Sequence, residues 1–131
     1  MQAFHDDVKK LAKHNSDFRR VLFTGPHSQL VLMCLQPGEE IGEESHEADQ
    51  LFYFVDGEGE ATIEGQPSPV EEHDAVLVPA GTLHNFRNTG RKPLRLFTSY
   101  APPQHADGTV HHSKQDAEAA EAEEHHAPTP A

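Results

Sequence analysis

The sequence of 131 residues contains one cysteine, Cys34, and no run of about eighteen apolar residues that could cross a membrane as a helix. A single cysteine cannot form a disulfide within the chain, which fits a reducing compartment. The N-terminal residues lack the basic region followed by an apolar stretch that marks a secretory signal. We therefore expect a cytoplasmic protein in which Cys34 is a buried, unreactive thiol.

Basic residues are also scarce, with 10 Lys and Arg against 22 Asp and Glu and a formal net charge of -12. Nucleic acid and anionic membranes both require a basic surface, so we expect neither as a partner. The sequence has no G-x-S-x-G motif, no C-x-x-C motif and no phosphate-binding glycine loop. These absences disfavour hydrolysis by a serine nucleophile, thiol redox chemistry and nucleotide binding.

The length favours one domain with a segment on either side of it. Residues 1–17 are expected to form an N-terminal arm or a short amphipathic helix, because apolar residues recur there at helical spacing. Residues 104–131 are expected to form an acidic, mostly disordered tail. Ser113 and Asp116 could cap a helix in this tail, but its apolar side would carry only alanine. The domain itself then covers residues 18–103.

Short apolar runs separated by turn residues recur throughout the domain. The runs cover residues 18–24, 29–36, 50–55, 60–64, 75–78, 83–87 and 93–100. A glycine and two prolines within residues 65–69 indicate a turn. Many short strands at a spacing of about eight to twelve residues favour a sandwich or barrel over an α/β sheet. The predicted fold is therefore an all-β, single-domain jelly-roll barrel.

Four polar side chains are the candidate metal ligands: Glu44, His46, Gln50 and His84. Alternate side chains of a strand share a face, so Glu44 and His46 can point into the same interior. If separate strands bring Gln50 and His84 to them, the mixed nitrogen and oxygen set suits a divalent first-row transition metal. The alternative is a metal-free polar pocket in which these residues hydrogen-bond to one another. Gln50 could also orient a water or the substrate, because an amide oxygen is a poor ligand.

Three aromatic residues, Phe52, Phe54 and Phe86, share the inward phase of Gln50 and His84. They could form an apolar wall around a bound ligand, and they are equally well explained as core residues.

Two further residues are given no part in the site. Glu43 is expected to be a solvated surface acid, since the two-residue period points it away from the face of Glu44. His105 is interpreted as a flexible surface histidine, with the alternative that it covers the mouth of the barrel.

The spacing of these residues resembles the two sequence motifs of the cupin family. Matching positions occur at Pro37, Gly38, Glu44, His46, Gln50, Gly57, Pro79, Gly81, His84 and Asn88. The family usually supplies His-x-His and then Glu in its first motif, and a last His in its second. In this chain Glu44 takes the first His position and Gln50 takes the Glu position, whereas His46 and His84 match.

The resemblance is to small bacterial single-domain cupins, and it implies a divalent iron, manganese, nickel, zinc or copper ion at this ligand set. It also implies a metal-dependent enzyme that acts on a small polar organic molecule, by dioxygenation or by sugar-type isomerase or lyase chemistry. The alternative is a non-catalytic cupin that binds or senses a small molecule. Small cupins commonly form homodimers, and the apolar segments 18–23 and 30–35 could pair or pack across a two-fold axis.

Overall fold

The computed structural model describes residues 2–126 and, within them, nine strands and two helices. In chain order they are α1 (Val8–His14), β1 (Arg19–Thr24), β2 (Gln29–Leu35), β3 (Asp49–Asp56), β4 (Glu58–Ile63), β5 (Gln66–Glu71), β6 (Ala75–Val78), β7 (His84–Asn88), β8 (Leu94–Ala101), β9 (Val110–His111) and α2 (Lys114–His126).

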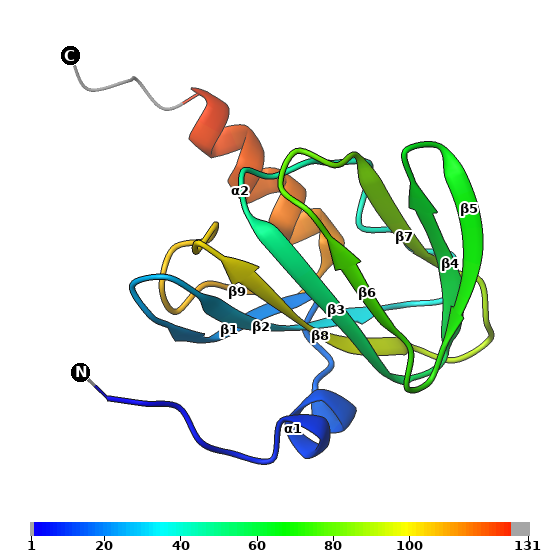
Figure 1. Ribbon diagram of the computed structural model, residues 1–131, viewed down its shortest axis with the longest axis horizontal. Coiled ribbons are helices and arrows are strands. Elements are labelled where there is room, and N and C mark those ends of the chain that lie inside the picture. Colours follow the sequence, from blue (N-terminus) through cyan, green and yellow to red (C-terminus); the bar gives the residue numbers. More distant parts are fainter. Residues whose placement is uncertain (1, 127–131) are drawn as a thin grey trace.

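The strands form two antiparallel sheets that face each other (Figure 1). The larger sheet has the order β6-β3-β8-β2-β1-β9, and the smaller has the order β5-β4-β7. The apolar core lies between them, with Phe52 and Leu96 from the larger sheet and Ala61 and Phe86 from the smaller. The predicted all-β barrel is confirmed.

Helix α1 packs on the outer face of the larger sheet, over β2, β3 and β8. Ala12 of α1 packs with Leu32 and Val55 in a second apolar cluster. The Asp7 side chain caps the helix by accepting a hydrogen bond of 3.0 Å from the Lys10 backbone N–H. Of the two forms expected for residues 1–17, the structure thus contains the short helix.

Strand β5 occupies residues that the sequence analysis assigned to a turn. It contains Pro67 and Pro69, which pair with Thr62 and Glu60 of β4. β5 is the outer strand of the smaller sheet, so only one side of its backbone needs to hydrogen-bond to a neighbour. The prolines are tolerated there, and their presence explains why a strand was not predicted.

The two segments proposed for dimer formation lie inside the larger sheet. β1 pairs with β2 on one side and with β9 on the other, while β2 pairs with β1 and β8. β9 pairs only with Arg19 and Arg20, so the other end of β1 keeps an open edge, whereas β2 has a strand on each side. The outer strands of this sheet are β6, where Leu77 is 74% exposed, and the short β9.

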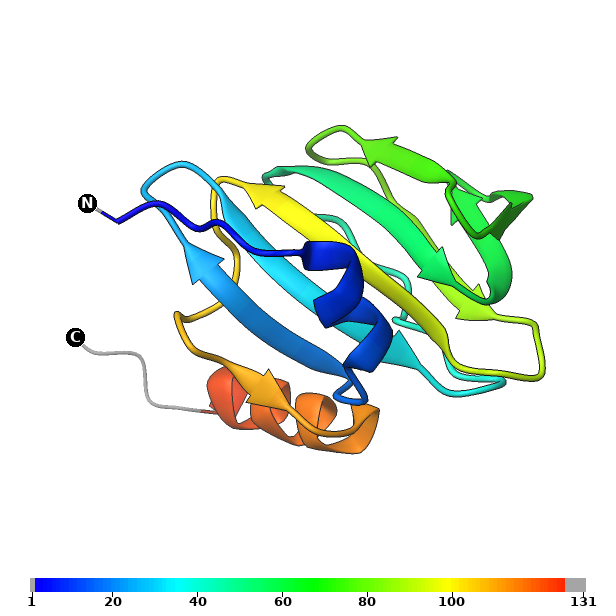
Figure 2. The same ribbon diagram turned by 90° about the horizontal axis from the view of Figure 1, so that it is seen from below.

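Residues 104–126 contain more regular structure than expected for a mostly disordered tail. β9 pairs with β1, and the Ser113 side chain accepts a hydrogen bond of 3.0 Å from the Asp116 backbone N–H at the start of α2. Ala117 of α2 is buried in the main core, where its small side chain allows a close approach. The two helices lie on opposite faces of the larger sheet (Figures 1 and 2). Residues 127–131 of the expected tail lie outside the described residues.

Neither helix in the described part of the chain is long and apolar enough to cross a membrane.

Two glycines with similar backbone angles provide a test of the packing at the β3–β4 turn. Gly57 has φ +92° and Gly38 has φ +84°, so alanine at either position is strained by about 1–2 kcal/mol. A Cβ at residue 57 would also lie 2.8 Å from the Pro93 carbonyl oxygen, whereas one at residue 38 meets no atom within 4 Å. We predict that Gly57→Ala lowers the free energy of unfolding by at least about 1 kcal/mol more than Gly38→Ala. Urea denaturation measures both, and equal losses would contradict this account.

Candidate metal centre

Two segments far apart in the sequence are joined at Glu44 and His84. The backbone N–H of each donates to the carbonyl oxygen of the other, and both hydrogen bonds are 2.9 Å long. The Gly81 N–H also donates to the His46 carbonyl oxygen at 2.8 Å. These backbone hydrogen bonds fix the loop that carries Glu44 and His46 against the start of β7, where His84 lies.

The side chains of Glu44, His46 and His84 converge. Glu44 Oε1 lies 3.2 Å from His46 Nε2 and 3.7 Å from His84 Nε2. One ligand atom from each residue lies within 4.8 Å of the other two. We refer to these three residues as the triad, and their spacing makes it a possible site for a metal ion.

Gln50 joins the same interior from β3 and is 1% exposed. Its amide nitrogen donates a hydrogen bond of 3.0 Å to Thr98 Oγ1 on the neighbouring strand β8. That bond leaves Oε1 as the free end of the amide. Tyr100, which lies opposite Gln50 in the β3–β8 pairing, packs edge-on against His46 with ring centroids 5.5 Å apart.

Three buried atoms at this site lack a hydrogen-bond partner among residues 2–126: His46 Nε2, His84 Nε2 and Gln50 Oε1. His46 Nε2 approaches Glu44 closely, but the alignment of the two groups does not make a hydrogen bond. Buried polar atoms in proteins are normally partnered. A cation would satisfy all three, because each is able to present a lone pair. The donor set therefore fits a divalent metal ion.

The His84 ring is oriented by its second nitrogen. Nδ1 lies 2.9 Å from the Thr82 carbonyl oxygen, which only accepts, so Nδ1 carries the proton. In the neutral ring this leaves Nε2, the atom directed at Glu44, with its lone pair. Although burial opposes it, the Glu44 carboxylate and the Thr82 carbonyl raise the pKa of His84 above its ordinary value of 6.5.

Glu44 is ionised at neutral pH. Burial by itself raises the pKa of its carboxyl group, but the adjacent imidazoles of His46 and His84 outweigh burial and lower the pKa to about 2. The side chain is 26% exposed, so it lies nearer to solvent than His84 or Gln50. Glu43 is exposed, as expected.

The predicted aromatic wall is fully buried, and its members lie at different positions relative to the triad. Phe52 contacts the His84 ring edge-on at 5.7 Å between ring centroids, and Phe86 packs against Phe52 at 4.1 Å. Phe54 packs against Phe86 at 5.6 Å. A role for the three rings as the wall of a substrate pocket stays a prediction.

The sequence analysis missed Thr98 and Tyr100 and assigned His105 to the surface. The alternation of side chains along β8 places Thr98 and Tyr100 on the inner face of the strand, but the sequence does not show which residues they contact. The His105 ring is half-buried, with Nε2 3.3 Å from the Tyr100 hydroxyl. Burial and the charge of Arg19 lower the pKa of His105 to about 4, so the ring is neutral at pH 7.

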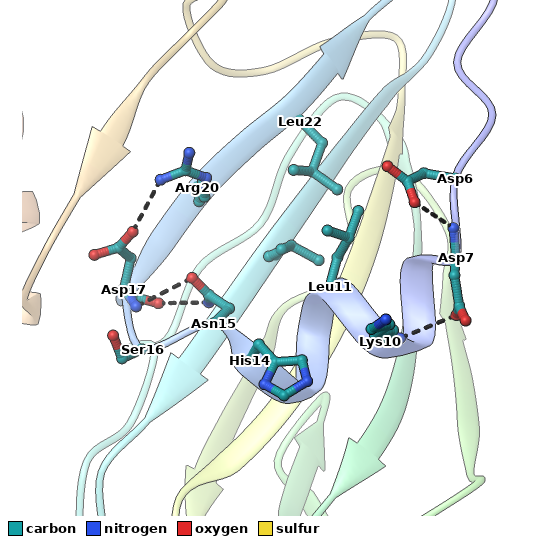
Figure 3. Close-up of a pocket in the computed structure, with 11 residues that line it drawn as sticks. Asp6, Asp7, Lys10, Leu11, His14, Asn15, Ser16, Asp17, Arg20 and Leu22 are labelled. Atoms are coloured by element: carbon teal, nitrogen blue, oxygen red, sulfur yellow. Dashed lines mark hydrogen bonds and ion pairs between the residues drawn. The ribbon is translucent and has the colours of Figure 1, made fainter.

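The larger surface clefts do not contain the triad. One of about 460 Å³ lies between α1 and the outer face of β1 and β2, lined by Leu11, Leu22 and charged residues such as Asp17 (Figure 3). A smaller cavity of about 170 Å³ is lined by Arg19, His105 and Glu121. We place the candidate site at the triad because the unpartnered donor atoms lie there. The larger clefts elsewhere contain none of these atoms.

Comparison with known proteins identifies related sequences. The family model described as a cupin domain matches residues 31–100, which is more than half of the chain. The chain is 43% identical over 122 residues to YrkC, an uncharacterised protein of Bacillus subtilis, and the alignment covers 88% of this chain and 66% of YrkC.

Two further relatives extend the comparison. The crystal structure of BH2720 from Bacillus halodurans is 42% identical and superposes with a TM-score of 0.87 over 90% of this chain and 95% of that one. The acireductone dioxygenase of Parvibaculum lavamentivorans is 29% identical over 111 residues, which cover 72% of this chain and 60% of the dioxygenase.

The pKa of Glu44 predicts how the metal-free protein responds to acid. A carboxyl group whose pKa falls on folding contributes stability that is fully present above its unfolded value of 4.5 and is lost as the pH falls towards about 2. Between these values the wild-type protein should lose about 1–3 kcal/mol more unfolding free energy than Glu44→Gln. Urea denaturation at a series of pH values after metal removal measures this difference. Parallel curves would show that Glu44 is not held ionised by the imidazoles.

Proposed function

Because the chain belongs to the cupin family, we propose that it is a metal-dependent enzyme that acts on a small polar organic molecule. The observation that carries the proposal is the set of three buried, unpartnered atoms beside the ionised Glu44. We infer that a divalent iron, manganese, nickel, zinc or copper ion binds there.

The four residues would hold the ion in different ways. His46 and His84 would supply neutral imidazole nitrogens, and Glu44 would supply the single negative charge. Gln50 would be the fourth ligand or an orienting group for the substrate, with its amide held by Thr98. The bound ion would supply Lewis acidity or oxygen activation.

Neighbouring residues would prepare the site. The Thr82 carbonyl keeps the proton of His84 on Nδ1, and Phe52 shields the same ring from water. Burial raises the pKa of Tyr100, so its hydroxyl keeps its proton at neutral pH. That hydroxyl could donate a hydrogen bond to a substrate oxygen, at the side of the interior bounded by His46 and His105.

Two reaction classes fit this site: dioxygenation, and isomerase or lyase chemistry on sugar-type substrates. The likeness to acireductone dioxygenase supports the first class. The chain spans 60% of the length of that enzyme, so we extend the enzyme's type of activity to this chain only as part of the proposal.

The charges of the proposed ligands predict opposite outcomes for two substitutions. With Glu44 ionised and the other three ligands neutral, a divalent ion leaves the site with one net positive charge. Glu44→Gln removes the only anionic ligand and should weaken metal binding by at least about tenfold. Gln50→Glu should keep or tighten binding, since carboxylate is the better donor, and should alter any activity by lowering the Lewis acidity of the ion. Competition with a chromogenic chelator compares both variants with the parent.

The control is Glu43→Gln, which removes an exposed acid next to the site and should leave metal affinity unchanged. Protein purified without a His-tag or nickel column should contain about one metal ion per chain by elemental analysis. Metal-free protein that takes up no divalent ion would favour the alternative, a non-catalytic cupin that binds or senses a small molecule. Wild-type affinity in Glu44→Gln would show that Glu44 is not a ligand.

We also predict a homodimer, for which the edge strand β6 is a better candidate than the short open end of β1 or the internal β2. Leu77 on β6 is largely exposed, and an unpaired edge is a natural site of strand pairing. Light scattering should give twice the chain mass at micromolar concentration, and Leu77→Lys should shift the protein to the monomer. Exposed Val110→Lys on the opposite edge is the matched control. A wild-type monomer would contradict the prediction.

A further inference from the structure

A buried arginine lies in the cavity of about 170 Å³ beneath α2. The Arg19 side chain is 3% exposed. It projects from β1 towards the inner face of the sheet, as does its register partner Met33, which belongs to the apolar core. Its guanidinium carbon lies 5.3 Å from the centre of the Phe18 ring. Burial of a charged group is costly unless a partner of opposite charge compensates it.

The partners of Arg19 compensate this charge weakly. Glu121 Oε1 of α2 is 3.7 Å from Arg19 Nη1, which is longer than a hydrogen bond, and the Glu121 side chain is 54% exposed. His111 Nδ1 lies 3.2 Å from the same nitrogen and must accept, because a guanidinium only donates. Arg19 Nε has no hydrogen-bond partner in the part of the chain that the structure describes.

The cavity around Arg19 suits a small anion. Glu121 is the only acid among the described residues that line it, and the neutral His105 and Thr109 form other parts of its wall. A guanidinium binds planar carboxylates through two parallel hydrogen bonds, and the unpartnered Nε is one of the donors available for this.

The cavity adjoins the triad through one side chain. Tyr100 packs edge-on against His105, which lines the cavity, and edge-on against His46, with ring centroids 5.2 Å and 5.5 Å apart. A molecule held by Arg19 would therefore lie on the Tyr100 side of the triad.

We propose that Arg19 is an anion subsite that binds the carboxylate of a small organic acid in place of Glu121. When no ligand is present, the Glu121 carboxylate lies next to the Arg19 guanidinium. When the acid is bound, α2 covers it. As a statement of substrate class the inference rests on the metal-dependent function proposed above. As a statement of binding it can be tested on metal-free protein.

The experiment is calorimetric titration of the full chain after its metal is removed and the chelator is dialysed away. The probes are malonate, its neutral analogue malonamide, and inorganic phosphate. Malonate should bind and malonamide should not. Arg19→Met should weaken malonate binding by about tenfold or more, whereas Glu121→Gln should strengthen it several-fold by removing the competing carboxylate.

Two neighbouring substitutions are the controls. Arg20→Met removes the adjacent arginine, whose side chain is exposed and pairs with Asp17, and Glu118→Gln removes an exposed acid of the same helix. Both should leave malonate affinity unchanged. If Arg19→Met does not fold, the surface variant Glu121→Gln still tests the proposal.

Equal affinity for malonate and malonamide, or unchanged affinity in both Arg19→Met and Glu121→Gln, would overturn the subsite. Binding of phosphate without malonate would overturn its assignment to carboxylates. Malonate binding to a protein that takes up no metal would leave the subsite standing and reject the metal-dependent function. Metal uptake without malonate binding would do the reverse.

Discussion

The pair of backbone hydrogen bonds between Glu44 and His84 is the constraint on which the site depends. His84 begins β7 and pairs with Ile63 in the smaller sheet, while Gln50 belongs to β3 in the larger sheet. Glu44 lies on neither sheet and is positioned by its bridge to His84. Assembly of the candidate ligands therefore requires that the two sheets and this loop are already in place, so that closure of the barrel and formation of the site are one structural event.

Most strands could be predicted from the sequence because apolar runs and turn residues are local patterns. The candidate ligands were identified by their match to the cupin motifs, and the strand alternation invoked for Glu44 and His46 does not apply, because both residues lie on a loop. β5 was missed because its prolines are acceptable only at a sheet edge, and the sequence does not show which strand is outermost. The contacts of Thr98 and Tyr100 depend on strand register, which a single sequence does not determine.

The position of the C-terminal segment also could not be predicted from the sequence. Its composition indicates poor helix burial, and α2 does bury little beyond Ala117. Its position over the inner face of β1 depends on the pairing of β9 with that strand, a contact between residues at opposite ends of the chain. Two polar regions of the interior are thus neighbours: Glu44 with its two imidazoles, and Arg19 beneath α2. Tyr100 separates them, because its ring contacts both His46 and His105.

The exchange of charged and neutral residues at positions 44 and 50 would leave the total charge of the proposed ligand set unchanged, but it would alter the order in which the ligands release a bound ion. In the usual family arrangement the carboxylate takes the position of Gln50, which here is 1% exposed and held by Thr98. In this chain Glu44 is the only carboxylate of the proposed ligand set, and it is 26% exposed and lies on a loop. A proton or a competing chelator arriving from solvent would reach the charged ligand first. The rate at which a bound ion leaves would therefore be governed by detachment of Glu44, ahead of any movement of the histidines.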